Sequence, residues 1–374
     1  MGIVRGILIA VSALAALVVA VLGLTYVLLV PSRPDLTDAE RLSVPPPLRG
    51  SFVRLEDGVT HVKTHGPGDA PVVVLVHGFA TASYIFDDLA EILAASGFRV
   101  LTYDLYGRGL SDRVRPPYDL ALYLRQLNGL LTDHVPDRPV HLVGYSFGGT
   151  IAAAFAAAHP SQLTGVTFLA PAGLGPAPSG AGAALFSVMT APGIGEWMMN
   201  ALGPRLMGAQ VRQNFRKAPG AEGLLIGYDQ QERFAGFYPA LLSTLRATPV
   251  LGGGQPLYAS AVATGLPVSA IWAENDAEVP LAQADLLKEI APKIEIAIVP
   301  DADHTMPYVK PKVVANILKD TLPQHDSFTL LHRTNALQFT SFIITKFLTD
   351  YRSQQTSTPA RKHFFNVPLL YIDR

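Results

Sequence analysis

Hydrophobic positions gather first into one long run at the amino terminus. Gly6 to Val30 is a stretch of 25 residues without a charged side chain. As a helix it would be about 38 Å long, which is enough to cross the roughly 30 Å hydrocarbon core of a bilayer. The pattern therefore predicts a transmembrane helix over residues 6–30.

A cleaved signal peptide or a buried helix of a soluble protein would also be apolar. The run exceeds the usual signal-peptide core of about 7 to 15 residues. The residues that follow it, Pro31 to Pro34, lack a small-residue cleavage site, so the anchor is favoured. The Lys and Arg balance across the run is slight. The orientation is therefore predicted only from the short flank that precedes the run. A first span with such a flank favours an amino terminus in the cytoplasm and the remaining chain outside.

Residues 31–50 contain five prolines and no apolar periodicity, a composition typical of a semi-rigid linker. Two alternating runs around Asp57-Gly58 then predict an antiparallel hairpin from Ser51 onward. From Pro71 the pattern changes to short continuous apolar runs between helix-length segments. Strands buried on both faces of a parallel sheet require such runs. The predicted strands are 72–77, 99–104, 140–145, 166–170, 268–273 and 294–299, and the predicted helices lie near 83–96, 118–134, 147–159, 281–291 and 307–322.

This alternation predicts a doubly wound α/β fold whose core comprises residues 51–171 and 266–322. Residues 172–265 are too long for one crossover and contain several helical segments, so they are interpreted as an inserted helical cap. Four of the six methionines fall in this segment, and two of them, Met198 and Met199, are the candidates for contact with an apolar ligand. Residues 323–374 form a tail to which the sequence assigns no role.

Composition narrows the function. Lys and Arg total 29 against 30 Asp and Glu, for a net charge of −1, so no basic surplus indicates nucleic-acid binding. The absence of cysteine excludes disulfides, thiolate metal sites and cysteine nucleophiles.

The pentad Gly144-Tyr145-Ser146-Phe147-Gly148 matches G-x-S-x-G, a pattern that places a nucleophile on a strained turn. Its context fits, because a predicted strand precedes it and an Ala-rich helix follows it. A loop serine has no reason to occupy such a turn, so Ser146 is the candidate nucleophile.

A serine nucleophile needs a base and an acid that orients the base. Of ten histidines, only His304 lies in the loop after the last predicted strand, where a doubly wound sheet places ligand contacts. The acid is expected after the preceding strand, which is followed by Glu274, Asp276 and Glu278. Asp276 is preferred, and the order Ser, Asp, His is the one found in α/β-hydrolases.

With these motifs the chain resembles the α/β-hydrolase superfamily over Ser51 to Leu322, in particular the serine esterase and lipase-like group with a helical cap. The matching segments are VVVLVHGFA, YDLYGRGLSD, GYSFGG, WAENDAEVP and DADHTMP. The resemblance implies an oxyanion hole made by the backbone N–H groups of Phe79 and Phe147, a structural role for His77, and no cofactor or metal.

The sequence thus predicts a membrane-anchored, single-pass serine hydrolase with Ser146, His304 and Asp276 as its triad. Its expected substrates are acyl esters, including monoacyl lipids. C–C hydrolases, perhydrolases and acyltransferases share such a triad and stay open as alternatives, and a non-catalytic binding protein on the same scaffold is disfavoured by the intact triad. The oligomeric state is not determined by the sequence.

Overall fold

The computed structural model describes residues 2–44, 50–136 and 138–322. The tail assigned to residues 323–374 lies outside this part of the chain. The fold is built on an eight-stranded sheet with the order β1-β2-β4-β3-β5-β6-β7-β8. The strands are β1 Ser51–Arg54, β2 Val59–His65, β3 Val72–Val76, β4 Arg99–Tyr103, β5 Val140–Tyr145, β6 Leu163–Leu169, β7 Val268–Ala273 and β8 Glu295–Val299.

The hairpin of β1 and β2 is antiparallel and pairs with β4 at one side of the sheet. From β4 to β8 every neighbouring pair is parallel. The strand order reverses direction at β3, as in a doubly wound sheet. All five residues of β3 are buried, which explains the continuous apolar run at this point of the sequence. The predicted α/β-hydrolase fold with a mostly parallel sheet is confirmed.

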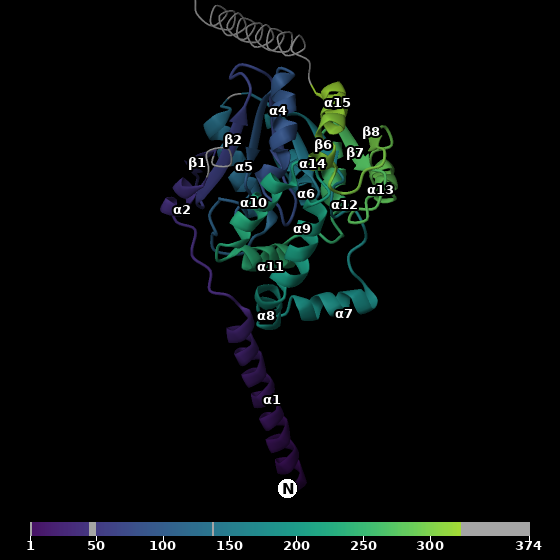
Figure 1. The fold of residues 1–374 in the computed structure, drawn as a ribbon. Coiled ribbons are helices and arrows are strands. Elements are labelled where there is room, and N and C mark those ends of the chain that lie inside the picture. The colour runs from purple at the N-terminus through teal and green to yellow at the C-terminus, as the bar shows by residue number, and fades with distance from the viewer. Residues whose placement is uncertain (1, 45–49, 137, 323–374) are drawn as a thin grey trace, which may run out of the picture. The chain divides into compact units, whose positions relative to one another are not determined.

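Helices cover both faces of this sheet (Figure 1). The crossover from β3 through α4 to β4 runs in the opposite direction to the later crossovers, and right-handed connections therefore place α4 on the other face. Accordingly, α4 packs with α15, whereas α5, α6, α12 and α13 pack in succession. Their bounds are α4 Asp87–Ala95, α5 Leu120–His134, α6 Phe147–Ala158, α12 Gln255–Ala263, α13 Gln283–Ile290 and α15 Pro311–Thr321. Three shorter helices are η1 Ser83–Phe86, η2 Pro160–Gln162 and α14 Met306–Val309.

Between β6 and α12 the chain forms a group of helices that we call the cap. Its helices are α7 Gly180–Met189, α8 Ile194–Ala201, the short π-helix η3 Pro204–Gly208, α9 Ala209–Phe215, α10 Ala221–Glu232 and α11 Phe237–Ala247. The cap predicted from the sequence, residues 172–265, also includes α12. In the structure, α12 contacts the core helices α6 and α13.

Two helices precede the sheet. Helix α1, Gly2–Leu29, contains a span from Ile3 to Leu29 with a mean hydropathy of 2.9. None of its described side chains is buried, and the span is long and apolar enough to cross a membrane. Helix α2, Asp38–Ser43, falls within the predicted linker. Its Arg41 is buried, pairs with Asp112 and donates to the Leu110 carbonyl. This part of the linker therefore differs from a free spacer, because it is held on the core by a buried cation.

Candidate active site

Ser146 stands between β5 and α6 with φ 53° and ψ −119°. Residues other than glycine rarely adopt this backbone conformation, which costs them about 1–3 kcal/mol. The surrounding backbone fixes it there: the Ser146 N–H donates to the Leu169 carbonyl, and the Ser146 carbonyl accepts from Gly149 and Ala172, each at 2.9 Å. The strand, turn and helix predicted around the pentad are therefore present, with Ser146 at the strained position.

The small residues of the pentad allow this turn to pack closely. A Cβ atom at Gly144 would lie 2.4 Å from the Gly148 carbonyl oxygen, and one at Gly148 would lie 2.1 Å from the Val76 carbonyl oxygen. Both contacts are with backbone, which cannot move aside as a side chain could. The glycines thus set the close approach of α6 to β5 and β3.

The structure brings His304 and Asp276 together. His304 Nδ1 lies 2.7 Å from Asp276 Oδ2, and the Asp276 side chain is fully buried. The other oxygen, Oδ1, accepts from the backbone N–H groups of Glu278 and Val279 at 2.9 and 2.7 Å. With both oxygens engaged, the carboxylate holds the His304 ring by Nδ1 and leaves Nε2 for another partner.

The electrostatics of His304 follow from its surroundings. Burial alone would lower the pKa of the imidazole, but the hydrogen bond to Asp276 and the negative charges of Asp276, Glu278 and Asp303 outweigh it, so the pKa of His304 is raised above its ordinary value of 6.5. Glu278 Oε2 lies 3.8 Å from His304 Nε2. The ring is therefore a stronger base than a free histidine.

Ser146 and His304 line one cavity of about 350 Å³, which we call the serine cavity. It also contains Phe79, Tyr145 and Glu278 and reaches the cap through side chains of η3 and α9, namely Met207, Gln210, Val211, Asn214 and Phe215. A volume of this size suits a small organic ligand. The cavity thus joins loops from four places in the sequence beneath the cap.

The loop after β3 is positioned by His77 and Arg108. The His77 ring bonds the Gly78 carbonyl through Nδ1 and accepts from the Leu105 N–H at Nε2, both at 2.9 Å, and burial lowers its pKa to about 4. Arg108 Nε donates to the Phe79 carbonyl at 3.0 Å. Phe79 therefore faces Phe147, the first residue of α6, with ring centroids 6.3 Å apart. The first N–H groups of a helix have no partner within the helix, so Phe147 offers one at the side of Ser146.

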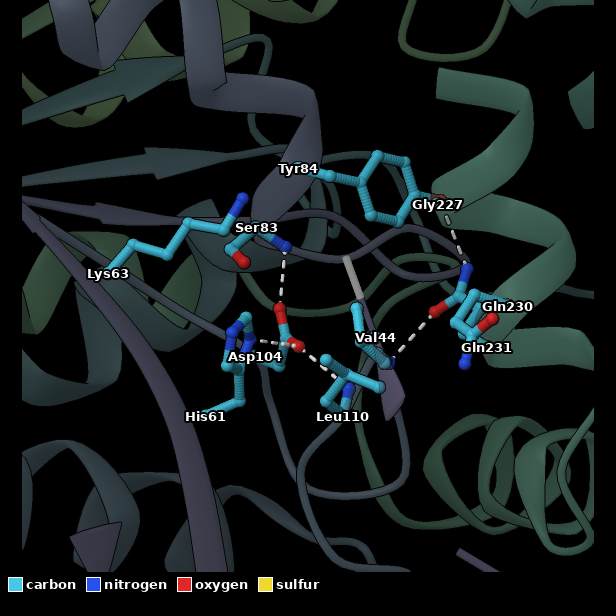
Figure 2. Close-up of a pocket in the computed structure, with 11 residues that line it drawn as sticks. Val44, His61, Lys63, Ser83, Tyr84, Asp104, Leu110, Gly227, Gln230 and Gln231 are labelled. Atoms are coloured by element: carbon cyan, nitrogen blue, oxygen red, sulfur yellow. Dashed lines mark hydrogen bonds and ion pairs between the residues drawn. The ribbon is translucent and has the colours of Figure 1, made fainter. Parts of the chain in front are cut away.

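A second buried His–Asp pair lies in a smaller cavity of about 30 Å³ (Figure 2). There His61 Nδ1 is 2.8 Å from Asp104 Oδ2, and the Ser83 and Leu110 N–H groups donate to the same carboxylate. Burial alone would raise the pKa of Asp104, but His61, His77 and the hydrogen bond from Ser83 hold it well below its usual range. Because the Asp104 carboxylate joins β2 to the turns after β3 and β4, this pair serves the fold.

The predicted cap candidates lie elsewhere. Met198 and Met199 line a separate cavity, whereas Met207 lines both that cavity and the serine cavity. Sequence reasoning also passed over Tyr145, whose hydroxyl donates to the His304 carbonyl at 2.7 Å. Its place directly before Ser146 in G-x-S-x-G was the one feature of the sequence that could have indicated this role.

No group of three or more His, Asp or Glu side chains within the described ranges could hold a metal ion.

Comparison with known proteins agrees with this architecture. The family model described as alpha/beta hydrolase fold matches residues 71–311. The chain is 39% identical over 120 residues to a 2-hydroxy-6-oxononadienedioate/2-hydroxy-6-oxononatrienedioate hydrolase of Cupriavidus pinatubonensis. The aligned segment covers 30% of this chain and 41% of the relative. It is 28% identical over 110 residues to the monoacylglycerol lipase abhd6-B of Xenopus laevis, 29% of this chain and 32% of the relative. The matches thus span less than half of either relative.

Among solved structures, an esterase from Thermogutta terrifontis superposes with a TM-score of 0.60 at 20% identity, over 72% of this chain and 97% of the esterase. That likeness concerns the fold. The family model covers more than half of the chain and includes the Ser146 turn, Asp276 and His304. The chain belongs to the alpha/beta hydrolase fold family.

Proposed function

We propose that the protein is a serine hydrolase of uncharged acyl esters. The observation that carries this proposal is the strained Ser146, which shares the serine cavity with a His304 ring held through Nδ1 by Asp276. A buried histidine with a raised pKa, held through Nδ1 so that Nε2 can face a serine in the same cavity, is the arrangement that activates a hydroxyl for attack on a carbonyl carbon.

In this mechanism the Ser146 hydroxyl oxygen bonds to the ester carbonyl carbon while its proton passes to His304 Nε2. Asp276 orients the ring and stabilises the imidazolium. The backbone N–H groups of Phe79 and Phe147 donate to the oxyanion. His304 then protonates the leaving alcohol, which departs as the acyl-enzyme forms. Water attacks the acyl carbon with His304 as base, and the carboxylic acid and free Ser146 result.

The lining of the serine cavity supports an uncharged substrate. Among the described residues that line it there is no lysine or arginine, and Glu278 contributes a negative charge. A dicarboxylate, such as the substrate named for the Cupriavidus relative, would meet no cation there and would be repelled by Glu278. The C–C hydrolase alternative is therefore disfavoured relative to a neutral ester, the class that the name of the Xenopus lipase indicates.

The experiment is labelling of the full-length protein with a fluorophosphonate probe, with the modified peptide mapped by mass spectrometry. We expect modification at Ser146 and none in Ser146→Ala. Ser187→Ala is a matched control, because Ser187 lies exposed on α7 and bonds only within its helix. Absence of labelling in folded wild-type protein contradicts the proposal.

We further propose that α1 spans the membrane as a single anchor, with the catalytic domain on the extracytoplasmic side. Its 28 residues correspond to about 42 Å of helix. Because the chain contains no cysteine, single-cysteine variants report topology without background. In intact cells, a membrane-impermeant maleimide is expected to label Glu289→Cys, at an exposed position of α13, but not Arg5→Cys. The reverse pattern contradicts this orientation.

A further inference from the structure

The cap carries an apolar surface that no other described element covers. Helix α7 has no buried residue, although it is composed of Gly, Ala, Leu, Phe, Ser, Val and Met. Leu185 is 60% exposed, Val188 54%, Met189 41% and Ile194 43%. The sequence contains no Asp, Glu, Lys or Arg between Arg138 and Glu196. We call these four exposed side chains the α7 surface; three of them lie on α7, and Ile194 is the first residue of α8. Leu185, Val188 and Met189 are spaced i, i+3 and i+4 and therefore share one face of α7, and an exposed apolar face of this kind marks an interaction site.

The α7 surface lies next to the proposed membrane anchor. Trp197 of α8 donates through Nε1 to the Leu22 carbonyl and the Thr25 hydroxyl of α1, each at 3.2 Å. Helices α7 and α8 pack together, and Figure 1 shows both on the side of the domain that faces α1. Thr25 stands within one turn of the end of α1, which places α8 where a membrane-spanning helix leaves the hydrocarbon.

Polar contacts hold α7 in this position without a buried face of its own. Arg246 of α11 donates to the carbonyls of Thr190 and Ala191 just after α7, at 2.7 and 3.2 Å. The same guanidinium pairs with Glu196 at 2.6 Å, and this hydrogen bond lowers the pKa of Glu196 to about 2. The apolar side chains of α7 are thus available for contact with the hydrocarbon of a bilayer.

Behind α7 lies the second cavity, of about 340 Å³, which we call the α7 cavity. None of the described residues that line it is charged. Its rim opens on the surface, because four large hydrophobic residues of the lining are exposed: Leu185, Met189, Leu206 and Leu251. At its inner end Met207 also lines the serine cavity. A thioether side chain is unbranched and adapts its rotamer readily, so Met207 is suited to separate or connect the two cavities.

We propose that the α7 surface lies in the interfacial region of the bilayer that α1 spans, and that an acyl chain of a membrane lipid reaches Ser146 through the α7 cavity, past Met207. This inference rests on the acyl-ester function proposed above and names where its substrate comes from. Transfer of the exposed Leu, Val and Met side chains of α7 from water to the acyl region of a bilayer is favourable, and the anchor α1 keeps them close to that bilayer. The uncharged cavity behind it offers the hydrocarbon chain an apolar path out of the bilayer.

The membrane contact is tested by quenching of tryptophan emission in phosphatidylcholine vesicles with brominated acyl chains. The chain has two tryptophans, and Trp272 is fully buried in β7. Trp197 is kept because it contacts α1, and we expect full-length Leu185→Trp to lose a larger fraction of its emission than the wild type when brominated lipid replaces the ordinary lipid. Val313→Trp is the matched control, because Val313 is an exposed aliphatic residue on α15. A fractional loss of emission in Leu185→Trp no larger than in the wild type overturns the proposal.

The path of the chain is tested by photo-crosslinking with an alkylglycerol ether that carries a diazirine near the end of its chain and has no ester to cleave. We expect crosslinks at the residues that line the α7 cavity, which lie within residues 178–207 and 242–251. Gly182→Trp should reduce them about tenfold, because each methylene displaced from apolar contact weakens binding roughly fourfold. A Cβ at Gly182 meets nothing within 4 Å, and the same holds for Gly223 on α10, so Gly223→Trp is the matched control.

Crosslinks only at residues that do not line the α7 cavity, or equal labelling of wild type and Gly182→Trp, overturn the inference. Neither readout requires turnover. Failure of fluorophosphonate labelling at Ser146 would therefore overturn the proposed chemistry, whereas failure of quenching or crosslinking in protein that labels normally would overturn only the lipid path.

Discussion

The Tyr145 hydroxyl donates a 2.7 Å hydrogen bond to the backbone carbonyl of His304, and the two rings lie with centroids 5.0 Å apart. The residue that precedes Ser146 therefore holds the loop that carries the proposed base. This contact couples the turn after β5 to the loop after β8, two segments that the fold brings together from 159 residues apart.

Tyr145→Phe should therefore impair the reaction by loosening His304. We expect kcat to fall by about tenfold to hundredfold, because a displacement near 1 Å of a catalytic group has this order of effect, with a smaller change in KM. The unpaired buried carbonyl should also cost about 1–3 kcal/mol of stability. Steady-state kinetics and urea unfolding measure the two effects.

The control for this variant is Tyr106→Phe. Tyr106 is also buried, and its hydroxyl donates to the Gly58 carbonyl at 3.1 Å, away from the serine cavity. A similar loss of kcat in both variants would show that Tyr145 acts through general stability and not through the position of His304.

Asp276→Asn tests the proposed orienting carboxylate. The amide can keep the backbone N–H donors of Glu278 and Val279 but cannot stabilise a charged imidazolium, so we expect kcat to fall about 10⁴-fold. Asp303→Asn is the control, since Asp303 directly precedes His304 in the sequence but its carboxylate bonds Thr305 and Lys217. Equal effects of both substitutions on the fluorophosphonate labelling rate would remove Asp276 from its proposed role.

The raised pKa of His304 predicts a pH dependence. Only the neutral ring can accept the Ser146 proton, so kcat/KM should be lost as the pH falls through a midpoint above 6.5. Glu278→Gln removes a negative charge 3.8 Å from Nε2 and should lower that midpoint. Since the Glu278 side chain is 56% exposed, solvent screening limits the shift to roughly half a pH unit.

Glu289→Gln on the exposed side of α13 supplies the reference for this shift, since it changes the net charge equally at a distance from the cavity. A pH profile with a midpoint below 6.5, or one unmoved by Glu278→Gln, would contradict the assignment of the titrating group to His304.

The sheet could be predicted from the sequence because its strands are buried on both faces. Val72–Val76 is a continuous apolar run for that reason, and the strained turn at Ser146 is marked by glycines whose Cβ atoms would clash with backbone. Similarly, the predicted helix near 281–291 is observed as α13, Gln283–Ile290. These features are local, so periodicity and turn chemistry were sufficient to locate them.

The cap was less predictable, because its function depends on contacts between distant segments. Nothing in the local sequence distinguishes Met198 and Met199 from Met207, although only Met207 reaches the serine cavity. Likewise, the prolines of residues 31–50 concealed α2, whose position depends on the ion pair of Arg41 with Asp112, a residue far along the chain. Tertiary charge pairing of this kind leaves no periodic signal.

The contacts of Arg108 connect the cap to the loop of the proposed oxyanion donor Phe79. Its buried guanidinium donates to the Phe79 carbonyl through Nε, to the Tyr123 hydroxyl through Nη1 and to the Thr244 hydroxyl through Nη2, at 3.0, 2.7 and 2.9 Å. It therefore joins the loop that carries a proposed oxyanion donor to α5 and to cap helix α11. An ammonium group cannot reproduce this planar fork.

Arg108→Lys should consequently destabilise the protein by about 2–4 kcal/mol, because several buried acceptors lose a charged donor. It should also lower kcat about tenfold or more by releasing Phe79, since loss of one oxyanion donor costs roughly 10² to 10³ in rate. Arg113→Lys is the comparison: its guanidinium donates to the Gly109, Ser111 and Gln231 carbonyls but not to Phe79. If both variants lose stability but only Arg108→Lys slows acylation by the fluorophosphonate, the cap is coupled to the oxyanion hole through Arg108, whereas equal acylation rates would confine Arg108 to a role in folding.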